Sequence, residues 1–284
     1  MAEVEDKSTK PSLSTSAIKM LAKCGTQYEK RYIEGIKIPP GTAQIVGIAT
    51  HQTVNADLKE KKDKGELLPS DVIADRAAQG VKGTWEQGVV FTNEEKKEGI
   101  KKIKGAAIDD AVSLSRLHHG DMAPKIEPLE LERFFRIELV GYDFDLTGRM
   151  DIEEVDGAIR DTKTSKRSPT QKDVDADDQL TIYSLAKNVV EGAHHEDIAK
   201  AFAVANRIQP RKLYMDYLVK TKVPKVVVVE TRREPKQMYR LFRLIEKAVE
   251  VHKTGVFMPN PNGWWCSKSW CGYWDQCPFF SGRE

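Results

Sequence analysis

The four cysteines constrain this chain more than any other feature, because they stand near its two ends. Cys24 is alone in the N-terminal part, and the other three fall within a dozen positions near the C-terminal end: Cys266, Cys271 and Cys277. Disulfides are not expected in a chain of this size without a secretory signal. A shared metal ion or cluster is favoured instead, and it would hold the two ends of the chain together. Four thiolates can bind either Zn²⁺ or an iron–sulfur cluster, and spacing alone slightly favours zinc.

Composition indicates a globular protein outside the membrane. The apolar fraction is 40% and the charged fraction is 31%, and no apolar run approaches the roughly 18 residues that a membrane span needs. Residues 1–12 are polar and contain no signal-like apolar core. We therefore expect a cytoplasmic protein with no membrane contact. The formal net charge of +2 predicts no overall attraction for nucleic acid, although it leaves room for a local basic groove.

The order of helical and strand-like segments indicates one large α/β domain. We expect residues 1–12 to be a flexible tail and residues 13–284 to form a single domain. Helices are predicted at 14–33, 45–64, 171–191 and 236–252. Residues 59–125 predict a helical insertion, within which Thr92 and Glu95 form a capping box. Strands are predicted at 131–140, 142–155, 158–163, 201–208 and 223–229.

Two of these strands carry the residues with the clearest chemistry. The first contains Gly148-Arg149-Met150-Asp151 and the second contains Asp161-Thr162-Lys163. Because side chains alternate along a strand, Asp161 and Lys163 point to the same face. A carboxylate can hold Mg²⁺ while a neighbouring lysine orients the attacking water or stabilises developing negative charge. The pair suits phosphodiester hydrolysis, although Asp-x-Lys alone is common by chance and fits a solvated edge hairpin equally well.

The turn between the strands decides whether Asp151 joins that pair. A two-residue Asp156-Gly157 turn would place Asp151 opposite Thr162, facing away from Asp161. A three-residue loop with Gly157 in a left-handed conformation pairs Glu154 with Ala158 and places Asp151 across from Asp161. We predict the three-residue loop, because only that register brings the two carboxylates together.

Further polar residues fall where they could face the same site. Gln179 and Tyr183 are four positions apart on a predicted helix and so share one helix face. His51 lies on an earlier helix, where a neutral imidazole could bind a metal ion, although a lone helical histidine is more often structural or at the surface. Basic residues near strand ends are candidate phosphate contacts, although charged loops are usually just solvated; they are Lys166 and Arg167 directly after the second strand, and Arg207, Arg211 and Lys212 at the expected end of a later strand.

Taken in order, these motifs resemble the RecB-like branch of the PD-(D/E)XK nucleases. The motif residues are His51, Gly148 to Asp151, Asp161 to Lys163, and Gln179 to Tyr183. The opening Leu13-Ser14-Thr15-Ser16-Ala17-Ile18 is similar to the first helix of that branch. The ending Cys266-x4-Cys271-x5-Cys277-Pro278 resembles the iron–sulfur ending of phage exonucleases and of the CRISPR-associated iron–sulfur nucleases. The resemblance spans residues 13–278. Asp161 stands where many relatives have Glu, and the Cys266–Cys271 spacing is wider than the usual Cys-x2-Cys.

The resemblance implies an α/β nuclease fold with a mixed central sheet flanked by helices, a helical insertion and a cluster-bearing end at residues 259–284. It implies that His51, Asp151, Asp161 and the Thr162 carbonyl hold Mg²⁺ or Mn²⁺. Lys163 would be the catalytic lysine, and Gln179 and Tyr183 would position the DNA strand. Cys24, Cys266, Cys271 and Cys277 would hold a [4Fe–4S] cluster, with Zn²⁺ as the alternative.

The activity implied by the resemblance is a metal-dependent DNA exonuclease that hydrolyses phosphodiester bonds at single-stranded DNA or DNA ends. A phage or prokaryotic recombination, replication or repair setting fits it. A nuclease of CRISPR adaptation and a DNA-binding subunit with a vestigial site are the alternatives. Partners would be DNA, with a homo-oligomer or a recombination or replication protein as further expectations.

Overall fold

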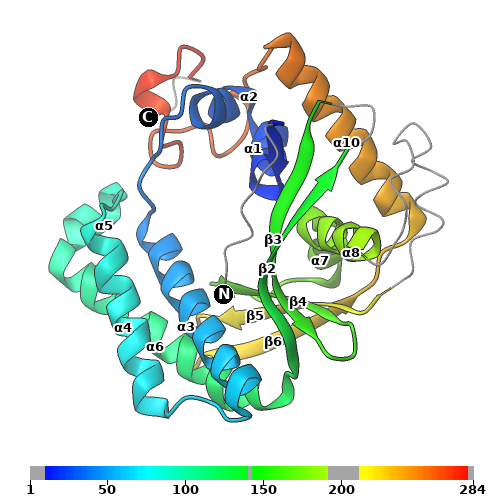
Figure 1. Cartoon of the computed structure of the whole chain (residues 1–284). Helices are drawn as coiled ribbons and strands as arrows, with labels where there is room; N and C mark the ends of the chain where they lie inside the picture. The colour runs from blue at the N-terminus through cyan, green and yellow to red at the C-terminus, as the bar shows by residue number, and fades with distance from the viewer. Residues whose placement is uncertain (1–9, 140–142, 191–210, 281–284) are drawn as a thin grey trace.

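A six-stranded mixed sheet forms the centre of the molecule, as expected for the predicted α/β fold. The computed structural model describes residues 10–139, 143–190 and 211–280. The strands are β1 (Ser12–Ser14), β2 (Pro128–Glu138), β3 (Asp145–Glu154), β4 (Ile159–Ser165), β5 (Leu213–Val219) and β6 (Lys225–Thr231). They follow the order β1-β3-β4-β5-β6, with β2 paired to β3 (Figure 1).

The central strand β3 has different partners on its two edges. The antiparallel neighbour β2 runs along nearly its whole length, from Asp145 to Glu154. Both remaining neighbours must therefore lie on the other edge: β1 pairs in parallel with Asp145–Thr147, and β4 pairs antiparallel with Ile152 and Glu153. Between them, residues 148–151 have no ladder partner on that edge among the described residues. The gap opens the sheet beside Asp151.

Helices cover both faces of the sheet (Figure 1). On one face lie α3 (Thr42–Lys64), α4 (Ser70–Glu86), α5 (Asn93–Glu98) and α6 (Ile100–Asp121), of which α3, α4 and α6 share a buried cluster with Leu218 of β5. On the other face, α8 (Asp178–Val190) and α10 (Pro235–Thr254) pack with the strands and α1 (Thr15–Lys23) around the main core. The predicted capping box is present, since Thr92 and Glu95 exchange side-chain-to-amide hydrogen bonds at the start of α5.

The N-terminal and C-terminal segments meet at one end of the molecule, where the red end of the chain lies beside α2 (Gly25–Tyr28) in Figure 1. The amide of Gly25 donates to the Met258 carbonyl at 2.9 Å, and the Tyr273 hydroxyl donates to the Ile36 carbonyl at 3.0 Å. The predicted helix at 14–33 is not continuous. Cys24 is extended, with φ of −164°, so the segment divides into α1, α2 and a π-helical turn, Glu29–Ile33.

Several other sequence predictions need correction. The helix expected at 171–191 is two helices, α7 (Gln171–Asp175) and α8, because Asp177 caps a new helix. Strand β5 was not predicted, and Arg211 and Lys212 directly precede it. The strand expected at 201–208 lies outside the described residues.

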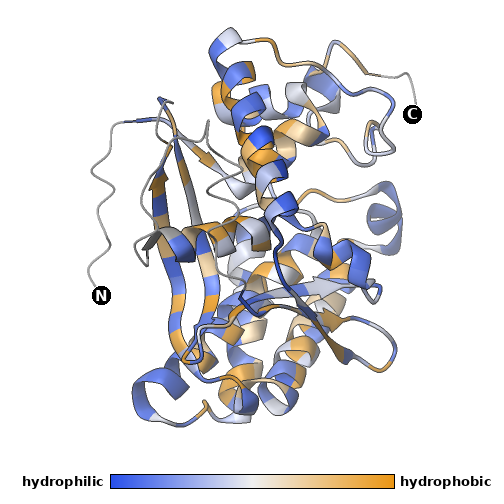
Figure 2. Ribbon diagram, turned by 90° about the vertical axis from the view of Figure 1, so that its right-hand side faces the viewer, coloured by the Kyte–Doolittle hydropathy of each residue, from blue (hydrophilic) through white to orange (hydrophobic). Residues whose placement is uncertain are grey.

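Hydrophilic and hydrophobic residues alternate along the helices in Figure 2, as in helices that are packed on one side and solvated on the other. In the part of the chain that the structure describes, no helix combines the length and the hydrophobicity needed to cross a membrane.

Candidate active site

The β3–β4 hairpin adopts the predicted three-residue loop. The Glu154 amide donates to the Ala158 carbonyl at 2.9 Å, and Gly157 has φ of +83°. The ladder pairs Ile152 with Arg160 and Glu153 with Ile159, so the same register places Asp151 opposite Asp161. A residue with a side chain would be strained at the positive φ of Gly157. The Asp-Gly turn therefore fixes which carboxylates meet.

An open cavity of about 390 Å³ lies in the gap between β1 and β4. We call it the carboxylate cavity; its lining residues are Ser14, Thr15, Ser16, Phe134, Thr147, Gly148, Arg149, Asp151, Gln179 and Tyr183. Gly148 is required here by packing. A Cβ at this position would lie 2.5 Å from the ring of its cross-strand partner Phe135. The motif glycine thus lets β2 close against β3 beside the cavity.

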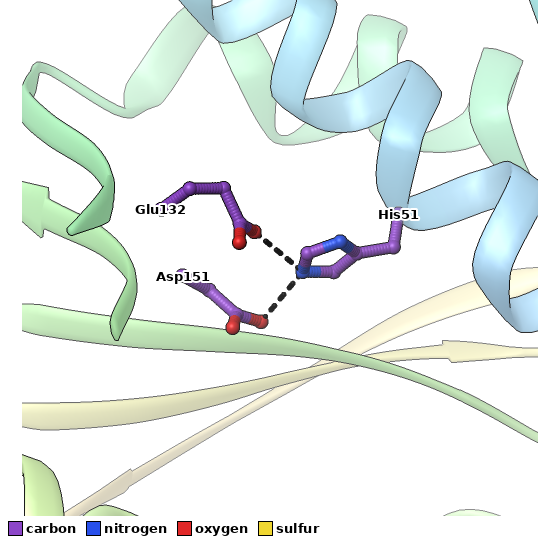
Figure 3. A group of neighbouring side chains, drawn as sticks. All are labelled: His51, Glu132 and Asp151. Carbon is purple, nitrogen blue, oxygen red and sulfur yellow. Dashed lines mark ion pairs between the residues drawn. The ribbon is translucent and has the colours of Figure 1, made fainter. Parts of the chain in front are cut away.

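Helix α3 brings His51 to the carboxylates. Its Nε2 lies 2.9 Å from Asp151 Oδ2 and 3.3 Å from Glu132 Oε1. Figure 3 shows both carboxylates pointing at the same ring nitrogen. The hydrogen bond with Asp151 raises the pKa of His51 despite its burial. Conversely, burial opposes ionisation of Asp151, but His51 and Lys163 outweigh it and hold the Asp151 pKa below its usual value.

Glu132 is a site residue that the sequence did not reveal. It is the only non-glycine among the described residues with positive φ, at 49°. Such a backbone is costly for a residue with a side chain, and such residues cluster at functional sites. Neighbouring Leu131 and Arg133 pair regularly with β3, so the kink is confined to Glu132 and turns its carboxylate toward His51. No pattern in Leu-Glu-Leu-Glu-Arg announces a left-handed residue.

Asp161 and Lys163 form the second part of the site. Their side chains share one face of β4, as predicted, and Lys163 Nζ lies 2.5 Å from Asp161 Oδ2. Asp161 is completely buried. Burial and the charge of Asp151 raise its pKa to about 7, although Lys163 acts in the opposite direction. Nearby, the Thr162 amide donates to Asp151 Oδ2 at 3.3 Å.

The donor set fits a divalent cation. One group of metal-ligating side chains stands out among the described residues, with ligand atoms within 4.8 Å of one another: His51, Glu132 and Asp151. Asp161 is not in that group, but its Oδ1 is buried and makes no hydrogen bond. Burial and the charge of Asp151 both raise the pKa of Asp161, and a bound cation would favour its ionised form. Carboxylate oxygens suit hard divalent cations, and an imidazole is a common ligand of transition-metal ions.

Helix α8 supplies the far wall of the carboxylate cavity. Gln179 Nε2 donates to the Tyr183 hydroxyl at 2.6 Å, so the two predicted residues share one helix face. Burial, followed by the charges of Asp161 and Asp151, raises the pKa of Tyr183, and the phenol stays protonated. Asp177 Oδ1 accepts from the Gln179 amide at 2.7 Å and fixes the start of the helix.

The predicted phosphate contacts do not gather in one place. Lys166 and Arg167 are exposed just after β4, at the Lys163 end of that strand. Arg211 lies instead beside the hairpin loop, with Nη1 3.5 Å from the position of a Cβ on Gly157. These positions are at opposite ends of the seven-residue strand β4, roughly 20 Å apart. Arg207 lies outside the described residues.

The four cysteines meet at the other end of α1. All four line one small pocket of about 20 Å³ with Trp265, Tyr273 and Phe279, which we call the four-cysteine pocket. None of these four described cysteines is in a disulfide. Gln27 Nε2 donates to Cys271 Sγ at 3.4 Å, and burial raises the pKa of that thiol. The pocket can hold a metal centre that prefers thiolate ligands.

The comparisons with known proteins agree with this geometry. The family model for the PD-(D/E)XK nuclease superfamily matches residues 12–278. The chain belongs to that superfamily, a class of nucleases. No curated protein matches the sequence.

A solved structure shares the fold at low sequence identity. A crystal structure from Eubacterium rectale named "Putative exonuclease" is 13% identical, with a TM-score of 0.56 over 94% of this chain and 92% of the other. A structure named SSO0001 is 15% identical over 92% of this chain and 95% of the other, and its TM-score of 0.34 supports no further comparison.

Proposed function

We propose that the protein is a Mg²⁺- or Mn²⁺-dependent DNA exonuclease. The observation that carries the proposal is the arrangement of His51 Nε2, Asp151 and the Asp161–Lys163 pair beside an open cavity. The name of the similar Eubacterium rectale structure also contains the word exonuclease. A single-stranded substrate or a DNA end fits an open cavity beside the unpaired stretch of β3.

Each residue has a role that follows from its place. His51, Glu132, Asp151, Asp161 and the Thr162 carbonyl would hold the cation. When bound, the cation supplies electrostatic stabilisation of the phosphate and a more acidic water. Lys163 is held by Asp161, so its ammonium stays charged and can hydrogen-bond the attacking water or the developing negative charge. Gln179 and Tyr183 donate hydrogen bonds from the opposite wall and orient the strand.

The four-cysteine pocket would hold a [4Fe–4S] cluster. A tetrahedral zinc ion with four thiolates brings their sulfurs to about 3.8 Å from one another. Among the described residues, no group of three cysteines has sulfurs within 4.8 Å. As a set, the sulfurs are therefore farther apart than a single zinc ion would hold them, which favours the larger cluster. Zn²⁺ is the alternative; brown colour in the anaerobic protein would separate the two.

Two other functions compete with this proposal. A nuclease of CRISPR adaptation would share the same site and differ only in substrate. A DNA-binding subunit with a vestigial site would not need the full set of carboxylates and lysine. The intact Asp151, Asp161 and Lys163 favour an active enzyme, which would work in phage or prokaryotic recombination, replication or repair. A homo-oligomer or a partner protein from these processes remains part of the proposal.

The test compares anaerobically purified wild type with Lys163→Ala. Each is incubated with Mg²⁺ or Mn²⁺ and end-labelled single-stranded or double-stranded DNA, with RNA in parallel. Progressive loss of one end label by the wild type alone supports an exonuclease and gives its polarity. Binding without degradation by either protein favours the vestigial site, and degradation of RNA alone would overturn the DNA substrate.

A further inference from the structure

We propose that the carboxylate cavity contains a phosphate-binding subsite, formed by the N-terminal end of α1 and by Arg149, which holds a substrate phosphate next to the one that is cleaved. This inference rests on the proposed nuclease function. It assigns a substrate-binding role to residues of the cavity other than the metal ligands and Lys163.

The position of the subsite follows from the parallel pairing of β1 with β3. Ser14 pairs with Thr147, so the chain enters α1 directly beside the strand that carries Asp151. Ser14, Thr15 and Ser16 line one wall of the cavity, and Arg149 and Asp151 line another. A substrate phosphate at Asp151 would therefore have its neighbour along the strand within reach of α1.

The end of α1 that faces the cavity favours an anion. The first amides of a helix have no partner inside the helix and carry partial positive charge. The nine-residue α1 has no acidic side chain in its first turn. The Ser14 hydroxyl accepts a hydrogen bond from the Ala17 amide at 3.1 Å and caps the helix. Thr15 and Ser16, which follow it, also line the cavity.

Thr15 provides the independent sign of a ligand. Its side chain is only 9% exposed, and its hydroxyl is buried without a hydrogen-bond partner. A buried hydroxyl without a partner is costly and calls for an explanation. Because Thr15 lines the cavity, a phosphate oxygen in the cavity would accept its hydrogen bond.

Arg149 supplies the charge on the opposite wall. It is exposed, and its guanidinium lies 5.8 Å from the ring centroid of Phe134, its cross-strand partner. Among the described residues Arg149 makes no ion pair within 4.0 Å, although its charge favours ionisation of the Glu132 carboxylate. A guanidinium that lies over an aromatic ring and makes no close ion pair is suited to phosphate, which it can bind through two parallel hydrogen bonds.

The phosphate could be a monoester at a strand end or the next diester in the backbone. The test measures binding of three fluorescent single-stranded oligonucleotides, with a 5′-phosphate, a 3′-phosphate or hydroxyls at both ends. Ca²⁺ replaces the catalytic cation so that the oligonucleotide binds without being cleaved. The variants are Arg149→Gln and Thr15→Val, the second of which removes the hydroxyl and keeps the shape. Arg116→Gln and Ser115→Ala are matched controls on α6, the first exposed and the second with a buried, unpartnered hydroxyl.

We expect Arg149→Gln to weaken binding roughly tenfold and to reduce the salt dependence by about one counterion. Thr15→Val should weaken it roughly fivefold, and the controls should match the wild type. If the variants lose affinity for only one phosphorylated oligonucleotide, the subsite binds a terminal phosphate monoester. If they lose affinity equally for all three oligonucleotides, it binds a backbone phosphate.

Wild-type affinity in both variants would overturn the subsite while leaving the nuclease proposal intact, provided the wild type degrades DNA in Mn²⁺. A wild type that neither binds nor degrades nucleic acid would overturn both. Arg149 is exposed, so its variant should fold even if Thr15→Val does not, and melting temperatures of all variants check this.

Discussion

The two pockets at opposite ends of α1 differ in almost every physical property. The carboxylate cavity is open, about 390 Å³ in volume, and lined by hydroxyl, carboxylate and guanidinium groups. The four-cysteine pocket is about 20 Å³ and is lined by sulfur, proline and aromatic residues. Helix α1 spans nine residues, so the two lie roughly 14 Å apart along its axis.

The difference shows that one short helix can contribute to a reactive site at one end and to a structural site at the other. At its N-terminal end, buried charge is held in an unfavourable state, with the Asp161 pKa raised to about 7 and a left-handed Glu132. Binding of a cation and a substrate would relieve these unfavourable interactions and so be favoured. At its C-terminal end, Cys24 joins segments from the two termini of the chain, where a metal centre would restrict the unfolded state. We therefore expect activity to depend on the first pocket and stability on the second.

The largest effect should come from Asp161→Asn. The substitution keeps the buried shape and removes the charge that would bind the cation, so nuclease activity should fall at least about 100-fold. The melting temperature should not fall, because a neutral amide is easier to bury than a carboxylate. Initial rates and melting curves beside Asp109→Asn, an exposed control on α6, check both. Full activity in the variant would remove Asp161 from the site.

The reverse pattern is expected for Cys24→Ser. Loss of one ligand should lower the unfolding free energy by about 3 kcal/mol or more and the melting temperature by roughly 10 °C. Chelation or oxidation of the wild type should have the same effect. Residual activity per folded molecule should change far less than in Asp161→Asn. If metal-free protein melted at the wild-type temperature, the four-cysteine pocket would have no stabilising role.

Glu132→Gln tests whether the carboxylate cavity has one more metal ligand than the sequence motifs indicate. The variant should need roughly tenfold more Mn²⁺ for half-maximal activity, with a similar rate at saturating metal. The exposed Glu138 lies on the same strand, so Glu138→Gln is the matched control. An unchanged metal requirement would show that Glu132 is not a metal ligand and only interacts with His51.

The smallest effect concerns a buried group that belongs to neither pocket. His118 on α6 is completely buried, and neither ring nitrogen has a hydrogen-bond partner in the described structure. Burial, aided by Arg160 and His119, lowers its pKa to about 3. The unfolded chain therefore binds a proton below about pH 6.5 that the folded protein does not. This contribution to stability is fully present above that pH and is lost as the pH falls toward about 3.

His118→Met removes that titration. Relative to the wild type, the variant should gain about 1.4 kcal/mol of unfolding free energy per pH unit below about pH 6. Comparing the two proteins isolates His118 from Asp161 and Asp216, whose raised pKa values act in the opposite direction. Denaturant unfolding at pH 8 and pH 5 measures the difference. Parallel stability curves would show that His118 is protonated in the folded protein.

Features that depend on neighbouring residues along the chain could be predicted from the sequence alone. Ser14 caps α1, and the Asp156-Gly157 turn sets a register that places Asp151 opposite Asp161. Gln179 and Tyr183 share a helix face because they are four positions apart. These outcomes follow from turn chemistry and from the periods of strands and helices. The superfamily could also be recognised, since its motifs are short and ordered along the chain.

Features that depend on contacts between distant segments could not be predicted from the sequence, and the fold reveals them. It turned Glu132 into a left-handed conformation beside His51, and it broke the first helix at Cys24. It also paired β1 and β4 with separate parts of one edge of β3, which opened the carboxylate cavity. Such features cannot be predicted from local sequence, because a strained backbone or an unpaired strand edge is stable only when distant groups compensate for it.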